Sequence, residues 1–255
     1  MVTDTQVEGA LRAVVFDFYG TIAWHGDAAA TPYATVFSRH GYRLDEAVEA
    51  DYFATYDGIE HAEQSTSEAV YESWVRGRLA GLARTCGVRD DDLEPLVDAL
   101  RSQDVAPVIP YPDAAPTLGA LRRRGFRIGV CSNWGWGLDR SIEQAGLGPL
   151  IDAAVTSARV GARKPHRVIY EAITGALDVA PTETLFVGDS FHPDVTGPLS
   201  LGMRAVHVWR ESPDSTRRPP PLPPAAHRVR SIEELLDWPL FAAPAAAGLA
   251  GGAAP

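Results

Sequence analysis

The sequence predicts an α/β fold in which a doubly wound parallel sheet is interrupted by a long all-helical insertion. A short apolar run at 13–16 ends in Asp17, which is the pattern of a buried parallel strand with a polar residue at its carboxyl end. The same pattern recurs at 127–131, 184–187 and 205–208. Helical patterns lie between these runs, and strands that alternate with helices form parallel sheets covered on both faces.

The insertion is predicted over residues 27–106, where apolar residues recur at helical spacing and no strand pattern interrupts them. Stretches that contain proline mark its two ends, around Pro32 and over 107–112. Outside the insertion, helices are predicted over 114–124, 138–145 and 167–177. A capping-box pattern that begins at Ser231 predicts a last helix over 231–240.

These patterns divide the chain into a core, an insertion and a tail. Residues 1–26 and 107–240 are predicted to form the α/β core, with 27–106 as a separate helical domain. Residues 241–255 are mostly alanine, glycine and proline and are predicted to be disordered. A chain of 255 residues with 45% hydrophobic side chains is long enough to bury a substantial core.

The composition excludes several classes of partner. The chain carries 33 acidic and 23 basic side chains and a formal net charge of −10, so it has no excess of cations for nucleic acid or an anionic membrane. No apolar run is long enough to span a membrane, and the first residues lack the pattern of a signal peptide. The two cysteines have no CxxC spacing, which fits a reducing compartment. We therefore expect a cytoplasmic protein that acts on a small molecule, with its oligomeric state left open.

Polar residues follow the apolar runs, at the edge of a parallel sheet where ligands collect. Asp17 can act as a nucleophile, forming an aspartyl ester that water later hydrolyses. Gly20 permits a tight turn after it, and Thr21 is expected to bond the Asp17 carboxylate. Ser132 and Asn133 end the second run, where a hydroxyl and backbone N–H groups suit an anionic oxygen.

Lys164 and two further carboxylates extend this set. Lys164 is the single lysine among 23 basic residues, and Pro165 after it is expected in the first turn of a helix. The helix dipole opposes a cation there, so carboxylates and an anionic substrate are expected beside the ammonium. Asp189 and Asp194 follow the third run and can converge on one cation. Since Mg²⁺ prefers oxygen ligands and keeps several waters, two aspartates and a backbone carbonyl would suffice from the protein.

In chain order, these motifs resemble the motif set of the haloacid dehalogenase superfamily over residues 13–194. The motifs are Asp-x-x-Gly-Thr at 17–21, Ser132, Lys164–Pro165 and Gly-Asp-x-x-x-x-Asp at 188–194. The resemblance implies a Rossmann-like core, a helical cap formed by the insertion, and hydrolysis through an aspartyl covalent intermediate. It also implies Mg²⁺ held by Asp17, the backbone carbonyl of Tyr19, Asp189 and Asp194. Residues 133–210 also resemble the phosphatase-like members.

Tyr19 departs from the pattern of the superfamily's phosphatases. Their residue at this position is a second aspartate that protonates the leaving alcohol and then activates water. A phenol with an ordinary pKa of about 10 can donate a proton but is a poor base. Tyr19, and Tyr170 six residues after Lys164, resemble the 2-haloacid dehalogenases, in which halide leaves without a proton. Those enzymes work without a metal, however, and have no acid at the position of Asp189.

We expect a Mg²⁺-dependent phosphatase that acts on a small phosphomonoester. The residues expected to be catalytic are Asp17, Tyr19, Ser132 and Lys164. Substrate contacts are expected from Thr21, Ser132, Asn133, Trp134, Lys164 and Tyr170. Two alternatives stay open. One is a metal-independent 2-haloacid dehalogenase in which Lys164 and Ser132 hold the carboxylate, and the other is a weakly active phosphate- or partner-binding relative.

Overall fold

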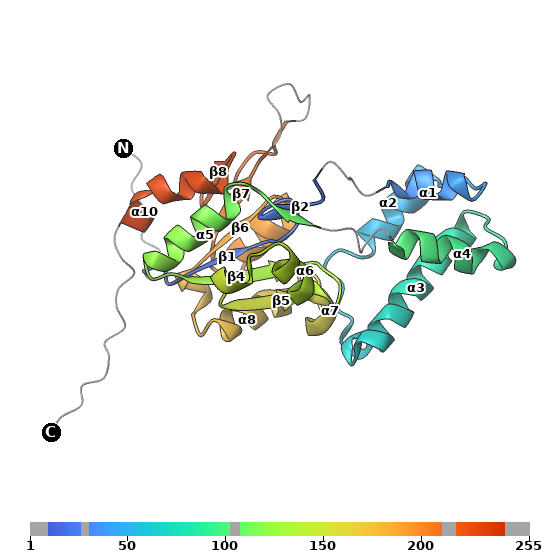
Figure 1. Ribbon diagram of the computed structural model, residues 1–255, viewed down its shortest axis with the longest axis horizontal. Coiled ribbons are helices and arrows are strands. Elements are labelled where there is room, and N and C mark those ends of the chain that lie inside the picture. Colours follow the sequence, from blue (N-terminus) through green and yellow to red (C-terminus); the bar gives the residue numbers. More distant parts are fainter. Residues whose placement is uncertain (1–9, 27–30, 103–107, 211–217, 243–255) are drawn as a thin grey trace.

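A six-stranded sheet forms the centre of the core (Figure 1). The computed structural model describes residues 10–26, 31–102, 108–210 and 218–242. The strands are β1 (Ala13–Phe16), β4 (Arg127–Ser132), β5 (Ala153–Thr156), β6 (Thr184–Gly188), β7 (Arg204–Val208) and β8 (Ala226–Val229). Their order is β5-β4-β1-β6-β7-β8, and every neighbouring pair is parallel, which confirms the predicted fold class. The edge strands β5 and β8 are only partly buried, and the sequence patterns did not reveal them.

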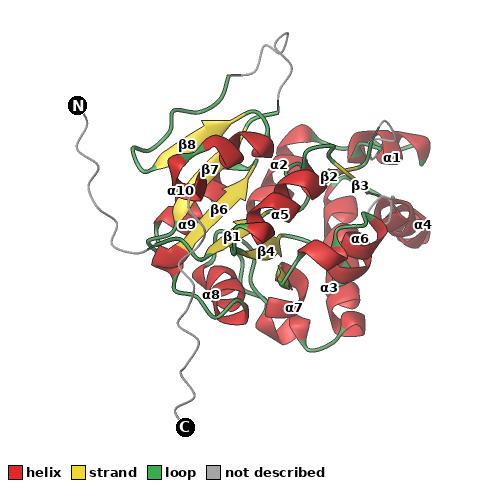
Figure 2. Ribbon diagram, turned by 60° about the vertical axis from the view of Figure 1, so that its left-hand side comes forward, coloured by secondary structure: helices red, strands yellow, loops and turns green. Residues whose placement is uncertain are grey.

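Helices cover both faces of the sheet (Figure 2). Alternate residues of β1 show this, because successive side chains of a strand point to opposite faces. Val14 packs in one apolar cluster with Leu118, while Val15 packs in another with Ile169. These helices are α5 (Ala114–Arg123), α6 (Leu138–Gln144), α7 (Ser157–Val160), α8 (Arg167–Ala176) and α9 (Gly197–Leu199). Short 3-10 and π turns connect them, at Gly148–Leu150, Pro181–Glu183 and His192–Thr196.

Four helices form a separate unit beside the carboxyl edge of the sheet (Figure 1). They are α1 (Tyr33–Arg39), α2 (Glu46–Ala54), α3 (Glu68–Thr85) and α4 (Asp90–Arg101), with a 3-10 turn at Ala62–Ser65. Side-chain caps begin two of them: Asp45 accepts from the first backbone N–H groups of α2, and Ser67 accepts from Val70 in α3. The unit is held by an apolar cluster that includes the fully buried Leu96 and Leu100 and extends to Ala158 of α7 in the core.

Two short backbone pairings lie where the helical unit meets the core, one between its two connections and one between its own loop and the core. In the first, β2 (Ala23–Trp24) pairs antiparallel with β3 (Ile109–Pro110). In the second, residues 58–61 run antiparallel to residues 161–164: the His61 N–H donates to the Gly161 carbonyl at 2.6 Å, and the Arg163 N–H donates to the Ile59 carbonyl at 3.0 Å. The loop of the helical unit is thereby fixed to the segment that carries Lys164.

The end of the described chain differs from the predicted helix. A 3-10 turn over Ile232–Asp237 is followed by the short α10 (Pro239–Ala242). Ser231 caps the turn as expected, accepting from Glu233 while Glu234 accepts from the Ser231 N–H. Pro239 ends the turn because proline lacks a backbone N–H and extends the residue before it. Phe241 was expected in a disordered tail, but it is fully buried, since it packs on Phe126. Residues 243–255, predicted as the tail, lie outside the described residues.

Within the described part of the chain, no helix combines the length and the apolar character that crossing a bilayer requires.

Candidate active site

Three neighbouring central strands deliver polar side chains to one edge of the sheet. Phe16 at the end of β1 is in register with Val130 of β4 and with Val187 of β6. The residues that follow these positions therefore meet at the same edge, namely Asp17, Ser132 and Asp189. Asp17 and Ser132 are buried, and Asp189 is partly exposed. The sequence predicted this convergence because the ends of parallel strands lie together.

Lys164 bridges two of the carboxylates. Its ammonium donates to Asp17 Oδ1 and to Asp194 Oδ1, both at 2.7 Å, and its side chain is only 2% exposed. Burial alone would lower the pKa of Lys164, but the two carboxylates more than offset this and raise it. The Lys164 side chain is therefore a charged ammonium at neutral pH. It is bonded to Oδ1 of Asp17, and Oδ2 of the same carboxylate has no bond to it.

Asn133 positions the backbone of Lys164 from the end of β4. Its Oδ1 accepts from the Lys164 N–H at 2.7 Å, and its Nδ2 donates to the Lys164 carbonyl at 3.0 Å. Both polar groups of Asn133 are thus engaged with the chain, although a substrate contact was expected. The prediction that Pro165 lies in the first helical turn is wrong, because α8 begins only at Arg167 and Lys164–Pro165 is a cis peptide in the turn before it.

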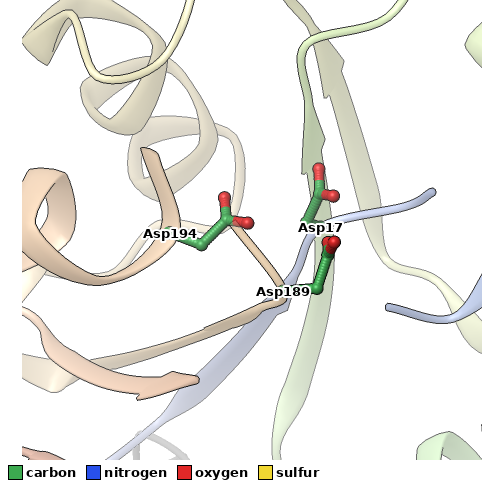
Figure 3. Close-up of side chains that lie close together, drawn as sticks. All are labelled: Asp17, Asp189 and Asp194. Atoms are coloured by element: carbon green, nitrogen blue, oxygen red, sulfur yellow. The ribbon is translucent and has the colours of Figure 1, made fainter. Parts of the chain in front are cut away.

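Asp17, Asp189 and Asp194 form a compact carboxylate cluster (Figure 3). One oxygen of each lies within 4.8 Å of one oxygen of the others. Asp194 is fixed by Lys164 and by the Ser190 N–H, which donates to its second oxygen at 2.9 Å. Burial raises the pKa of both Asp189 and Asp194, and the charge of Asp17 raises it further. The cluster therefore holds more negative charge than Lys164 neutralises.

Thr21 bonds a different carboxylate from the one expected. Its hydroxyl donates to Asp189 Oδ1 at 3.1 Å rather than to Asp17. The turn at Gly20 explains this, because Gly20 has a φ of +81° and a Cβ there would lie 2.6 Å from an oxygen of Asp189. The absence of a side chain lets the Asp189 carboxylate approach the backbone that follows Asp17.

The donors of this cluster fit a divalent cation such as Mg²⁺. They are carboxylate oxygens, which hard cations prefer. They converge from the end of β1 and from the loop and turn after β6, at a mutual separation that one ion can span. Because Gly20 has no side chain, the carboxylate of Asp189 has room to join the cluster. A cation would also relieve the repulsion that raises the pKa of Asp189.

Tyr19 and Trp134 lie beside the cluster as an aromatic pair. The ring of Tyr19 is 6.2 Å from that of Trp134 and 4.8 Å from that of His25, and its residue is 42% exposed. Burial and the nearby Asp189 raise the pKa of Tyr19 above its usual value. Its hydroxyl therefore stays protonated at neutral pH, so it can donate a proton but cannot accept one.

Tyr170 is placed behind the site rather than in it. Its side chain is fully buried, packs edge-on to Phe186, and donates its hydroxyl to the carbonyl of Pro193. That bond holds the loop that carries Asp194. In this conformation the Tyr170 hydroxyl is not available to a substrate, so the expected contact finds no support in the geometry.

Sequence reasoning missed His207, which holds the backbone of Asp189. Arg228 Nε donates to His207 Nδ1 at 3.1 Å, so the hydrogen of the imidazole is assigned to Nε2, which donates to the Asp189 carbonyl at 2.9 Å. His207 is fully buried, and burial lowers its pKa. The sequence feature that could have pointed to His207 is a single histidine inside the apolar run of β7.

An aspartate, a lysine and two further carboxylates lie together at the carboxyl edge of a doubly wound sheet, which is where α/β proteins of this class bind their ligands. The sequence matches the haloacid dehalogenase-like hydrolases over residues 11–202, and the chain belongs to this family.

Named relatives include both phosphatases and dehalogenases. The chain is 42% identical to phosphatase MT3486 of Mycobacterium tuberculosis over 102 residues, which is 39% of this chain and 46% of the relative. It is 25% identical to the ribulose-1,5-bisphosphate 5-phosphatase of Halopiger xanaduensis, covering 88% and 98% of the two chains. It is 28% identical to the (S)-2-haloacid dehalogenase 4A of Burkholderia cepacia, covering 91% and 96%. The match to the first of these spans about half the length of that phosphatase.

Solved structures share the fold. A HAD phosphatase from Thermococcus onnurineus superposes with a TM-score of 0.58 at 24% identity, covering 89% of this chain and 96% of that one.

Proposed function

We propose that this protein is a Mg²⁺-dependent phosphatase that hydrolyses a small phosphomonoester through a covalent intermediate on Asp17. The observation that carries the proposal is the presence of Asp189 as a third carboxylate beside Asp17 and Asp194. Lys164 contacts Asp17 and Asp194, whereas the pKa of the partly exposed Asp189 is raised by burial and by Asp17. An enzyme that displaces halide without a metal has no use for this extra negative charge beside its nucleophile.

Asp17 is the proposed nucleophile. Lys164 is bonded to Oδ1, which leaves Oδ2 to attack phosphorus. In the first step a bond forms between Oδ2 and phosphorus while the bond to the ester oxygen breaks, and the electron pair leaves with the alcohol oxygen, which gains a proton. In the second step the oxygen of water forms a bond to phosphorus while the bond between phosphorus and Oδ2 breaks. The electron pair restores the Asp17 carboxylate, inorganic phosphate leaves, and the proton of the water passes to solvent.

Lys164 and Ser132 are proposed to bind the phosphoryl oxygens, because both are buried, Ser132 ends β4 and the Lys164 ammonium contacts Asp17. The lysine ammonium balances part of the charge that develops on these oxygens. Asp17, Asp189 and the Tyr19 carbonyl would hold Mg²⁺, with Asp194 as a ligand or as support for the others. Bound Mg²⁺ would supply the remaining positive charge for the phosphoryl oxygens.

Tyr19 determines which step of the reaction we expect to limit turnover. Its protonated hydroxyl is the proposed donor to the leaving alcohol. Solvent then returns a proton to the phenolate, because the raised pKa of Tyr19 favours the neutral phenol, and the neutral phenol cannot take a proton from the attacking water. We therefore expect hydrolysis of the aspartyl phosphate to limit turnover. Trp134, beside Tyr19, is a proposed wall for the substrate.

The helical unit of α1–α4 is proposed to act as a cap over the carboxyl edge of the sheet. It lies at that edge (Figure 1), and its loop at 58–61 pairs with the segment that carries Lys164. A cap in this place excludes water and selects the substrate, as lids commonly do.

A second candidate is a 2-haloacid dehalogenase. Tyr19 in the first motif favours it, as does the similarity to the Burkholderia enzyme over nearly the whole chain. In this reaction Asp17 would displace halide from carbon, while Lys164 and Ser132 held the substrate carboxylate. A third candidate is a phosphate- or partner-binding relative in which Tyr19 has reduced turnover.

One set of assays separates the three candidates. Phosphate release from a panel of phosphomonoesters is measured with Mg²⁺ or with EDTA, beside halide release from 2-chloropropionate under the same conditions. We expect phosphate release that requires Mg²⁺ and no halide release. Halide release in EDTA would overturn the proposal in favour of the dehalogenase. Mg²⁺ binding without either product would favour the third candidate.

A further inference from the structure

Three buried nitrogen atoms without hydrogen-bond partners gather where the helical unit meets the core. They are His61 Nε2, Arg78 Nε and Arg163 Nε, and none has a partner among the described residues. His61 comes from the loop that pairs with the core, Arg78 from α3, and Arg163 from the residue before Lys164. Buried N–H groups are nearly always satisfied, so three in one place require an explanation.

Two aromatic rings bring these groups together. The guanidinium carbons of Arg163 and Arg78 lie 3.8 and 4.4 Å from the centroid of the Tyr56 ring. Arg78 also lies 5.7 Å from the ring of Trp74, on which His61 stacks at 4.7 Å. We call His61, Arg78 and Arg163 the cationic cluster. Tyr56 links the two arginines, and Trp74 links Arg78 to His61.

The two arginines of the cluster have no carboxylate partner among the described residues, although the chain has a net charge of −10. Other arginines of the helical unit do form ion pairs: Arg76 pairs with Glu94 and Asp98, and Arg101 with Glu72. Arg78 instead donates to the carbonyl of Tyr52. Both side chains are partly exposed, but the Nε atom of each is buried without a partner, so an anion from outside the chain can supply the missing acceptor.

His61 is suited to complete such a site as a neutral donor. The residue is 3% exposed, and its Nδ1 lies 3.0 Å from the Ser65 hydroxyl, which fixes the ring. Burial, Arg163 and Arg78 lower the pKa of His61 to about 4, so the ring is neutral near pH 7. When Nδ1 accepts from the Ser65 hydroxyl, Nε2 carries the hydrogen and faces the cluster as an unused donor.

We propose that His61, Arg78 and Arg163 form a second oxyanion site that binds a carboxylate or phosphate group between the helical unit and the core. Guanidinium groups match both oxyanions because they present parallel N–H donors. Arg163 belongs to the core and the other two belong to the helical unit, so a bound oxyanion would tie the two parts together.

The oxyanion has two possible sources. It is either a second anionic group on the substrate or a free inorganic anion. The substrate source rests on the proposed function, whereas binding of a free anion does not depend on it. Arg78 also lines an open groove of about 450 Å³ between α2 and α3, which includes Asp51 but neither His61 nor Arg163. Arg78 and Arg163 are both partly exposed, so solvent reaches their side chains.

The first experiment measures binding of inorganic sulfate by calorimetry to the wild-type chain, Arg163→Met and Arg159→Met. Methionine keeps an apolar stem against Tyr56 and removes the charge. Arg159 is a matched control, because its guanidinium lies over Trp136 at 5.9 Å but pairs with Asp139. We expect Arg163→Met to lose a sulfate site or to weaken it about tenfold, and Arg159→Met to behave as wild type. Arg78→Met is the second variant if Arg163→Met does not fold.

The second experiment identifies the source. Rates are measured on phosphoglycolate, which carries a carboxylate beside its phosphate, and on p-nitrophenyl phosphate, which has no second anionic group. If the substrate supplies the oxyanion, Arg163→Met raises KM for phosphoglycolate about tenfold with kcat within about twofold, and leaves p-nitrophenyl phosphate unchanged. If a free anion is the ligand, both KM values stay unchanged while sulfate binding is lost.

The proposal is overturned if folded Arg163→Met and Arg78→Met bind sulfate as wild type does and keep the wild-type KM for both substrates. Sulfate binding lost equally in Arg159→Met would also overturn it, because that result reports net charge rather than a site. If the proposed phosphatase function fails instead, the experiments give a different result. The wild-type chain would then release no phosphate, while the sulfate experiment would still be readable.

Discussion

Lys164 and Arg163 are neighbours in the chain, yet they belong to two charged clusters that are built in opposite ways. The ammonium of Lys164 lies between Asp17 and Asp194 and is paired with both. The guanidinium of Arg163 lies on an aromatic ring beside Arg78 and has no counter-charge among the described residues. The first cluster is assembled in advance, with cation and carboxylates in contact. The second holds donors and no acceptor, which indicates that its acceptor arrives with a ligand.

Removing the nucleophile is expected to have the largest effect on the first cluster. Asp17→Asn keeps an oxygen for the Lys164 bond but cannot form the covalent intermediate, so phosphate release should fall by at least about 10⁴-fold. The measurement is steady-state phosphate release at saturating Mg²⁺. Asp139→Asn, an exposed aspartate that pairs with Arg159, is the matched control and should keep wild-type activity. A modest loss in Asp17→Asn would mean that another group is the nucleophile.

Breaking the ion pairs of Lys164 tests how far the first cluster stabilises the fold. Lys164→Met leaves two buried carboxylates without their cation, which should cost about 3–5 kcal/mol of unfolding free energy. Urea unfolding followed by circular dichroism gives this quantity. Arg167→Met, which removes an exposed partner of Glu171, should change stability little. Equal effects of the two substitutions would contradict a special role for Lys164.

The cationic cluster is expected to make stability depend on pH through His61. The pKa of His61 is lowered to about 4 in the fold, against an ordinary value of 6.5. Between these values the unfolded chain binds a proton that the folded chain excludes, so the stability that His61 contributes is full above pH 6.5 and is lost as the pH falls toward 4. The loss is about 3 kcal/mol at most.

This pH dependence is measured by urea unfolding at neutral pH and at a pH of about 5, in wild type and in His61→Gln. His61→Gln should lose less stability over this interval than wild type does. His227→Gln, at an exposed histidine of β8, should follow wild type. An unchanged pH dependence in His61→Gln would show that His61 is protonated as easily in the fold as in the unfolded chain.

Tyr19→Asp tests the part of the first cluster that departs from the phosphatase pattern. A carboxylate at this position can activate water, so phosphate release should rise on the order of 10²-fold. Tyr19→Phe is the control, since it keeps the ring beside Trp134 and removes only the hydroxyl. Lower turnover in Tyr19→Asp would contradict the expectation that activation of water limits the reaction, and would mean that Tyr19 does more than donate a proton.

The four central strands and the first cluster could be predicted from sequence because both follow from local patterns. Apolar runs that end in polar residues give β1, β4, β6 and β7, and parallel pairing then brings Asp17, Ser132 and Asp189 together. The edge strands β5 and β8 were missed because most of their residues are only partly buried or exposed. The apolar run of β5 is short and mostly alanine, and β8 carries His227 and Arg228 at its centre. Hydrophobic periodicity in a sequence reveals buried residues, and the edge strands of this sheet have fewer buried residues than the central strands.

Other features of the site depended on contacts between distant segments. Thr21 bonds Asp189 rather than Asp17, since the turn at Gly20 lets Asp189 approach. The cationic cluster joins a loop of the helical unit to the residue before Lys164, and no local pattern pairs these segments. The hydroxyl of Tyr170 is used by the Pro193 carbonyl, which only the packed loop reveals.

The most direct test of the central claim follows the oxygen of the attacking water. The enzyme is turned over in water labelled with heavy oxygen, and mass spectrometry then locates the label in the released phosphate and in the peptide that contains Asp17. Water that attacks phosphorus places the label in phosphate and leaves Asp17 unlabelled, which is the result that we expect with Mg²⁺ and a phosphomonoester. Label in the Asp17 carboxylate after turnover of a 2-haloacid, with no phosphate released from any ester, would contradict the proposed phosphatase.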